Sequence, residues 1–196
     1  MPAFTDSTLF PTFYELPAAS SISTSSDEAQ RDWFLLAQIK EDMTITKPTV
    51  IVRDRSGVEF AVTFDDGDHR GMGLKFRKGH TLVVPRVVRT DRDEGKKAIV
   101  RVPEGQGAGV RIVPGSLEQV LELGEVLGGI EGAEAQGQGK KCAACGGAEK
   151  EGQALMRCTG CGAAAYCSKA CQVRGWSEMG HKANCKVIRS IKEIWP

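Results

Sequence analysis

The sequence contains no long hydrophobic run and no large surplus of charge. No window approaches the ~18 apolar residues of a membrane-spanning helix, and no basic stretch followed by an apolar run opens the chain. A formal net charge of +1 over 196 residues leaves no polybasic or acidic tail that would indicate a nucleic-acid or membrane partner. These absences predict a protein without membrane contact that stays in the nucleus or cytoplasm.

Cysteine is absent from the first 141 residues. All seven cysteines lie between Cys142 and Cys185, and His181 lies among them. A disulfide framework in a secreted chain favours an even number of cysteines, whereas seven thiolates and one imidazole give eight metal ligands in a reducing compartment. The count therefore favours metal binding.

The spacing of these residues suits two tetrahedral sites. The candidate ligands are Cys142, Cys145, Cys158, Cys161, Cys167, Cys171, His181 and Cys185. Two C-x2-C pairs can each form a tight turn, and each is followed by a glycine, Gly146 or Gly162, that accepts a positive φ. Eight ligands fill both sites and leave no open position for a substrate, so we predict two structural zinc ions. Spacing alone leaves open whether the ligands pair sequentially or interleave.

The rest of the chain predicts an α+β protein. Residues 1–32 include the Ser/Thr-rich run AASSISTSSDEAQ and are expected to form a flexible tail, anchored locally only by FPTFYELP. Residues 33–127 hold short β-rich runs between turn residues: TVIVRD, VEFAVTF, TLVVPRVVR, KAIVRV and VRIVP. This series predicts a small β-barrel or sandwich, with an OB-like barrel as the first choice. Pro85 places its strand at an edge or at a bulge.

Two helices are expected outside these strands. SLEQVLELGEVL closes the β-rich domain, with capping-box spacing between Ser116 and Gln119. HKANCKVIRSIKEIW has apolar residues at helical spacing and predicts an amphipathic terminal helix. Between them, residues 128–140 are rich in glycine and are expected to form a linker. Residues 141–196 would then form the metal-binding segment with its terminal helix.

The ligand order, together with YCSKACQ, Trp176 and HKANC, resembles the MYND-type zinc finger. The resemblance implies interleaved sites with these members: Cys142, Cys145, Cys167 and Cys171 in the first, and Cys158, Cys161, His181 and Cys185 in the second. More residues than usual separate Cys171 from His181, so SEMG is expected to form a longer turn. The β-rich region loosely resembles the N-terminal region of small fungal proteins that end in a lone MYND finger, which implies no activity.

The resemblance also implies a function. MYND fingers are mostly protein-interaction modules, and several bind short proline-containing peptides through residues that correspond to Gln172 and Trp176 here. On a helix these two stand one turn apart, so that an amide lies beside an indole that can stack on proline. Trp176 could instead pack over the metal sites, and both roles are compatible on different ring faces. We expect a zinc-binding adapter that captures a proline-containing peptide.

Two other classes of function compete with the adapter. In a nucleic-acid-binding or transcription-associated protein that uses the basic finger and an OB-like domain, the phosphate contacts would be Lys169, Arg174, Lys182, Lys186 and Arg189. Residues 140–196 carry ten Lys and Arg against four Asp and Glu, but the thiolates offset part of this surplus. Some MYND proteins are lysine methyltransferases with the finger inside a SET domain, whose motifs are not found here. The histidines His69 and His80 have no triad-like context. We therefore expect no enzymatic activity.

Overall fold

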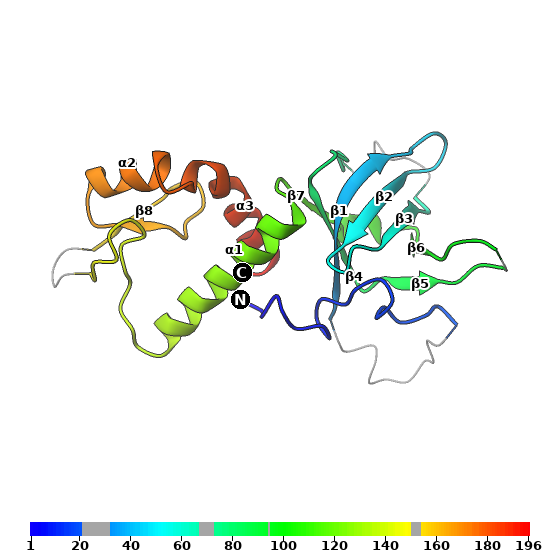
Figure 1. Cartoon of the computed structure of the whole chain (residues 1–196), viewed down its shortest axis with the longest axis horizontal. Helices are drawn as coiled ribbons and strands as arrows, with labels where there is room; N and C mark the ends of the chain where they lie inside the picture. Colours follow the sequence, from blue (N-terminus) through cyan, green and yellow to red (C-terminus); the bar gives the residue numbers. More distant parts are fainter. Residues whose placement is uncertain (21–31, 67–72, 94, 150–153) are drawn as a thin grey trace. The chain divides into compact units, whose positions relative to one another are not determined.

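The computed structural model describes residues 1–20, 32–66, 73–93, 95–149 and 154–196 (Figure 1). The chain divides into two compact units, of which one comprises Phe4–Glu118 and the other comprises Gln119–Pro196 with Met1–Ala3. No helix within the described residues is long and apolar enough to cross a membrane.

The first unit is built on one seven-stranded sheet. Its strands are β1 (Phe34–Asp42), β2 (Thr49–Asp54), β3 (Glu59–Phe64), β4 (Thr81–Pro85), β5 (Val88–Thr90), β6 (Ile99–Val102) and β7 (Arg111–Val113). Their order in the sheet is β5-β6-β3-β2-β1-β4-β7. Only β3 and β6 run parallel, and the other neighbours are antiparallel. The short runs found in the sequence are thus strands of a single sheet.

The sheet closes on itself through a bend between β4 and β5. These strands belong to opposite ends of the strand order, yet only Arg86 and Val87 separate them along the chain. Arg86 has a φ of 49°, and it follows Pro85, which ends β4 and has no N–H to donate. If β4 and β5 are counted as one bent strand, β1, β2, β3 and β6 complete a five-stranded barrel, and β7 pairs with β4 outside it. The predicted small barrel is confirmed.

The core of the barrel comes from alternating residues of its strands. In β3, Phe60, Val62 and Phe64 are buried while their neighbours are not, which is the pattern expected for a strand with one buried face. Val50 and Val52 of β2 face the same core. The period-two pattern read from the sequence therefore identifies the buried face correctly.

The N-terminal segment contributes to this core, contrary to the flexible tail expected over residues 1–32. Phe13 is buried, its ring stacks on Phe60 at 4.2 Å between centroids, and its N–H donates to the buried carboxylate of Asp54 at 2.7 Å. Phe4, Phe10 and Leu16 are buried as well. Burial of four large apolar side chains offsets the entropy of ordering the segment, so FPTFYELP acts as the anchor. The rest of the expected tail, residues 21–31, lies outside the described residues.

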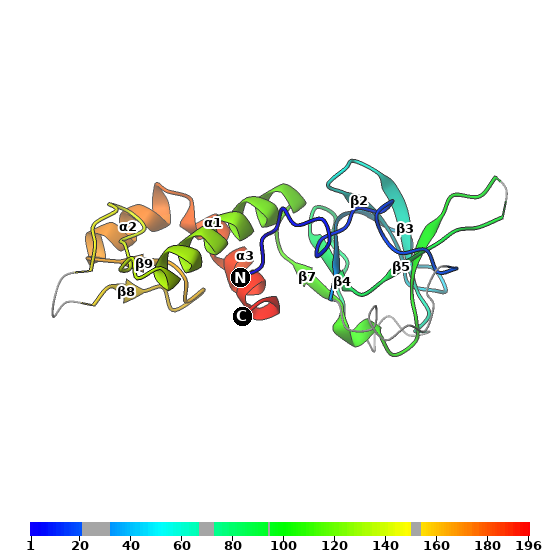
Figure 2. The same ribbon diagram turned by 90° about the horizontal axis from the view of Figure 1, so that it is seen from below.

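The second unit contains three helices and a short hairpin. Its elements are α1 (Leu117–Ala135), β8 (Met156–Arg157), β9 (Ala165–Tyr166), α2 (Lys169–Ser177) and α3 (His181–Ile194). In both views α1 and α3 lie side by side (Figure 1 and Figure 2), and the amide of Gln119 donates to the side-chain oxygen of Asn184 at 2.7 Å. The predicted terminal helix is confirmed, with Val187, Ile188 and Ile191 buried on one side.

Helix α1 extends through most of the segment expected to be a linker. The linker prediction over 128–140 is wrong for residues 128–135, where glutamates and alanines sustain the helix although each glycine costs about 1 kcal/mol. The helix ends at Ala135, and Gly137, whose φ is 79°, lies just beyond this end. The N–H of Gln138 bonds to the carbonyl of Ala133 and that of Gly137 to the carbonyl of Glu134, which is a Schellman cap.

Candidate metal centre

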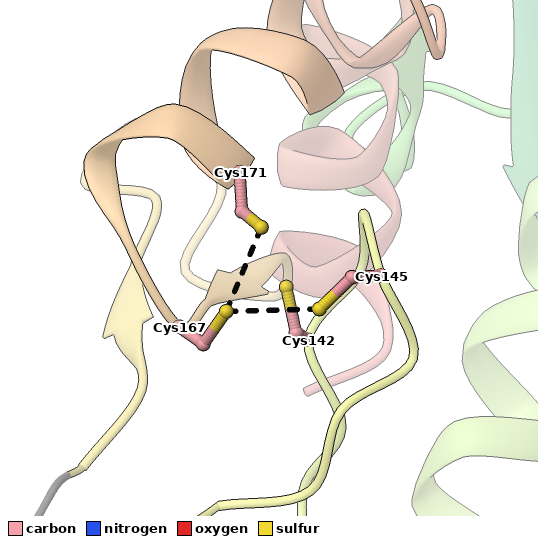
Figure 3. A group of neighbouring side chains, drawn as sticks. All are labelled: Cys142, Cys145, Cys167 and Cys171. Carbon is pink, nitrogen blue, oxygen red and sulfur yellow. Dashed lines mark hydrogen bonds between the residues drawn. The ribbon is translucent and has the colours of Figure 1, made fainter.

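The first cluster consists of four cysteines from three parts of the second unit. Cys142, Cys145, Cys167 and Cys171 direct their sulfurs toward one another (Figure 3), and all four Sγ atoms lie within 4.8 Å of each other. The Sγ of Cys167 lies 3.6 Å from that of Cys145 and 3.5 Å from that of Cys171. Cys142 is buried, whereas Cys145 and Cys167 are exposed. This cluster therefore has one side open to solvent.

The second cluster brings together Cys158, Cys161, His181 and Cys185. Its ligand atoms also lie within 4.8 Å of one another, but all four residues are buried. The sulfurs of Cys158 and Cys185 are 3.8 Å apart, and the Sγ of Cys161 lies 3.7 Å from Nε2 of His181. The ligand atoms are thus equally close together in the two clusters, but the second cluster is less accessible to solvent.

The two C-x2-C pairs form the same turn. The N–H of Gly146 donates to the carbonyl of Cys142 at 2.8 Å, and the N–H of Gly162 donates to the carbonyl of Cys158 at 2.8 Å. Both glycines have positive φ, 73° and 69°, as predicted from their position after the second cysteine. Each turn therefore aims two sulfurs at one point.

The short β8–β9 hairpin produces the interleaved arrangement. Cys158 directly follows β8, and Cys167 directly follows β9. The chain leaves the first cluster after Cys145, supplies Cys158 and Cys161 to the second, and returns along β9 to supply Cys167 to the first. The groups are those that the resemblance implies, and a sequential pairing does not occur.

The first turns of α2 and α3 place the last three ligands. The side chain of Ser168 caps α2 by accepting from the N–H of Cys171 at 3.1 Å, which fixes Cys171 in the first turn. His181 begins α3, and Cys185 follows one turn later on the same face. Between the helices, the turn ends at Gly180 with a φ of 74°. The longer turn expected from SEMG therefore keeps His181 in its site.

Hydrogen bonding prepares the first cluster for a cation. Burial raises the pKa of Cys142, but backbone N–H groups of Cys167, Ala144 and Cys145 outweigh it and lower this pKa to about 6. Hydrogen bonds with the side chains of Cys171 and Cys145 raise the pKa of Cys167 to about 12. Hydrogen bonding within the cluster therefore shifts the pKa values of Cys142 and Cys167 in opposite directions.

The second cluster repeats this pattern. Burial raises the pKa of Cys158, but the side chain of His181 and the backbone N–H groups of Cys161 and Gly160 outweigh it and lower this pKa to about 6. Burial, and then the hydrogen bond with Cys158, raise the pKa of Cys185 to about 12. A divalent cation would displace the retained protons and neutralise much of the charge on the sulfurs.

Both clusters fit zinc. With Zn–S bonds of about 2.3 Å, a tetrahedron has edges of about 3.8 Å between sulfurs. The closest sulfur pairs of the two clusters, at 3.5–3.8 Å, agree with this edge. Sets of four cysteines and of three cysteines with one histidine are those of structural zinc sites. The two clusters are therefore suited to two zinc ions, which would link the hairpin to the helices.

Two glycines support these sites and were not singled out from the sequence. A Cβ on Gly175 would lie 2.4 Å from a ring carbon of Tyr166, which is buried and packs edge-on against His181 at 6.1 Å between ring centroids. A Cβ on Gly160 would lie 2.9 Å from the Sγ of Cys185. Only the tertiary contact reveals these roles, because a glycine beside Trp176 or between two cysteines has no distinctive spacing.

The partner-binding residues implied by the resemblance lie on α2. Gln172 and Trp176 are exposed and one turn apart. The indole of Trp176 contacts the imidazole of His181 edge-on, with ring centroids 5.6 Å apart and planes at 63°, yet 41% of the residue is exposed. Trp176 therefore packs against a metal ligand while part of its surface remains exposed.

Basic residues near the finger are partly engaged. Of those considered as phosphate contacts, Arg174 lies 3.8 Å from Glu178, and Arg189 donates to Glu193 at 2.8 Å. Hydrogen bonding to Glu193 raises the pKa of Arg189. These two arginine–glutamate pairs reduce the positive charge available to a nucleic acid.

The other two histidines of the chain lie outside the finger. His69 lies outside the described residues. Burial, and then the charge of Arg77, lower the pKa of His80, which belongs to neither metal cluster.

Comparison with known proteins agrees with this geometry. Residues 142–185 match the family described as MYND finger. Over 42 residues the chain is 45% identical to human histone-lysine N-methyltransferase SMYD3, a match that covers 21% of this chain and 9% of that protein. Residues 142–185 are thus a MYND-type zinc finger, a class of module that generally mediates contacts between proteins.

A match was also found among solved structures. The solution NMR structure of the OB domain of MM0293 from Methanosarcina mazei aligns with 50% of this chain and 83% of that domain. The TM-score is 0.28, and the sequence identity is 15%.

Proposed function

We propose that this chain is a zinc-dependent, non-enzymatic adapter of the nucleus or cytoplasm whose finger captures a proline-containing segment of a partner protein. The observation that carries the proposal is the position of Trp176. Its ring is fixed against His181 on one edge, while the residue remains 41% exposed. An aromatic ring held in this way can stack on proline with little loss of side-chain entropy.

Gln172 supports the same reading. It lies one turn before Trp176 on α2 and is exposed. Proline-rich segments adopt an extended helix without internal hydrogen bonds, so their backbone carbonyls remain available to an amide donor. An indole beside an amide therefore suits a proline-containing peptide better than a polyanion, which would need a row of unpaired cations.

Because Trp176 rests against a zinc ligand, peptide binding should depend on zinc. The test is fluorescence anisotropy with a labelled Pro-x-Leu-x-Pro peptide and the zinc-loaded full chain. We expect Trp176→Ala to weaken binding by about 30-fold, as for an interface hot spot. Val173→Ala is the matched control, since Val173 is 57% exposed on the same helix. Equal affinity of the wild type and Trp176→Ala, with two zinc ions retained in both, would refute the proposal.

A further inference from the structure

A groove runs between α1 and the finger within the second unit. It encloses a cavity of about 460 Å³, which lies in the range of ~300–1,000 Å³ that is typical of binding sites. Its apolar wall is formed by Leu123, Val126, Leu127, Ile130, Met179 and Ile188. Neither Gln172 nor Trp176 lines this groove, which is lined instead by Gly175 of α2 and by Met179 of the turn that follows α2. The groove is therefore separate from the surface proposed above.

The wall of the groove exposes apolar side chains. Val126 and Ile130, one turn apart on α1, are 57% and 47% exposed, and Met179 on the finger side is 49% exposed. Met179 belongs to the longer turn between α2 and α3. A contiguous apolar surface contributed by separate elements favours burial against another molecule.

The rim of the groove is basic. Lys140, Lys141, Arg157 and Lys192 line it. Within the described part of the chain, none of these four takes part in an ion pair.

Little negative charge offsets this rim. Among the described residues, two glutamates line the groove. Glu131 accepts from the Met1 amino group at 2.7 Å, so that of these two only the carboxylate of Glu134 has no ion pair with a described residue. The only cysteine in the wall is Cys142, which is buried. Charge complementarity therefore favours an occupant that carries carboxylates beside its apolar side chains.

The backbone of the wall argues for a helix as the occupant. The carbonyl of Ala164 already accepts from the N–H of Cys158 at 2.8 Å, and the carbonyl of Ala165 accepts from the N–H of Ala143 at 2.8 Å. An extended segment would have to share these acceptors with the donors they already have, whereas a helix satisfies its own backbone and presents only side chains. We propose that this groove binds an amphipathic helix of a partner protein, with acidic residues flanking its apolar face.

The test uses two labelled peptides of about 18 residues, long enough to form a helix. Both carry leucines at helical spacing, and their flanking positions are all Glu in one and all Lys in the other. Anisotropy is measured with the zinc-loaded full chain. We expect the Glu peptide to bind at least about tenfold more tightly than the Lys peptide, with an affinity that falls as salt rises.

Matched variants locate the binding site. We expect Val126→Glu to weaken binding of the Glu peptide by about tenfold or more, while Val173→Glu, which adds the same charge at a valine that is also 57% exposed, leaves it unchanged. Lys141→Glu should reduce the preference for the Glu peptide. Equal effects of Val126→Glu and Val173→Glu, equal affinity for both peptides, or no binding up to about 1 mM would overturn the proposal. The proposal would also be overturned if the chain formed a dimer that Val126→Glu dissociates, because the occupant of the groove would then be a second copy of the chain.

Discussion

Removing the two zinc ions is expected to unfold the finger and leave the barrel folded. Structural zinc contributes ~10–16 kcal/mol to folding, which is comparable to the ~5–15 kcal/mol total stability of a typical domain. The finger has few large buried side chains besides Tyr166, Val187 and Ile191, whereas the barrel has its own core of valines and phenylalanines. The finger therefore depends on the metal and the barrel does not.

The structure sets the size of the expected change. Helix α1 has 19 residues, α2 has 9 and α3 has 14, so loss of the two finger helices removes somewhat more than half of the α-helix. The ions should leave in order, because Cys145 and Cys167 of the first cluster are exposed while all four ligands of the second are buried. We expect the first zinc to leave at least about tenfold faster than the second, since ligand exchange needs access.

The assay combines native mass spectrometry with far-ultraviolet circular dichroism during titration with a chelator. Cys145→Ser should retain one zinc and most of α3, whereas the matched Cys161→Ser should lose the signal of α3. A separate thermal transition of the barrel should persist in both variants. Loss of both ions without a fall in helical signal, or simultaneous release from the two clusters, would refute the reasoning.

Three further predictions follow from single contacts. Gly175→Ala should destabilise the finger by about 2–4 kcal/mol, because its Cβ would overlap a buried tyrosine ring. The control Gly132→Ala in α1, with open space around the added Cβ, should stabilise this helix by up to about 1 kcal/mol. Zinc retention against a chelator compares the two variants. Asp54→Ala should lower the free energy of unfolding in urea by about 2–4 kcal/mol, because it removes the acceptor of one buried N–H group, that of Phe13, and of two partly buried ones, those of Ser56 and Val58. A loss below about 1 kcal/mol would contradict this. Zinc affinity should rise with pH, by about tenfold per unit for each proton released. Near neutral pH the thiol of Cys185, with a pKa of about 12, must give up its proton to bind zinc. When the pH falls below the pKa of Cys158, about 6, Cys158 is protonated as well. A zinc affinity that does not change with pH in competition titrations would contradict this coupling.

The metal ligands could be predicted from the sequence because their chemistry is distinctive. Seven cysteines and His181 within 44 residues leave few alternatives to metal. Their pairing could not be read from spacing, because it depends on a hairpin whose strands, β8 and β9, have only two residues each. Strands this short show no periodic pattern, so the interleaving came from the resemblance.

Composition was a poor guide where a few residues decide the structure. The Ser/Thr-rich run favoured a flexible tail over the whole N-terminal segment, including Phe13, whose N–H bonds to a carboxylate 41 positions away. Glycines in residues 128–135 suggested a linker, although the helix continues to a cap at Gly137. Closure of the barrel depends on the bend at Arg86, and no local propensity marks a positive φ at an arginine.

The interleaved pairing has a consequence for synthesis of the chain. When Cys161 has left the ribosome, four cysteines are available, but they belong to two different tetrads, and neither tetrad is complete. The first tetrad closes only after Cys171 emerges, and the second only after Cys185. A nascent finger can therefore hold its final metal arrangement only when nearly the whole motif has been translated, and a break anywhere between Cys161 and Cys167 leaves no complete tetrad on either fragment.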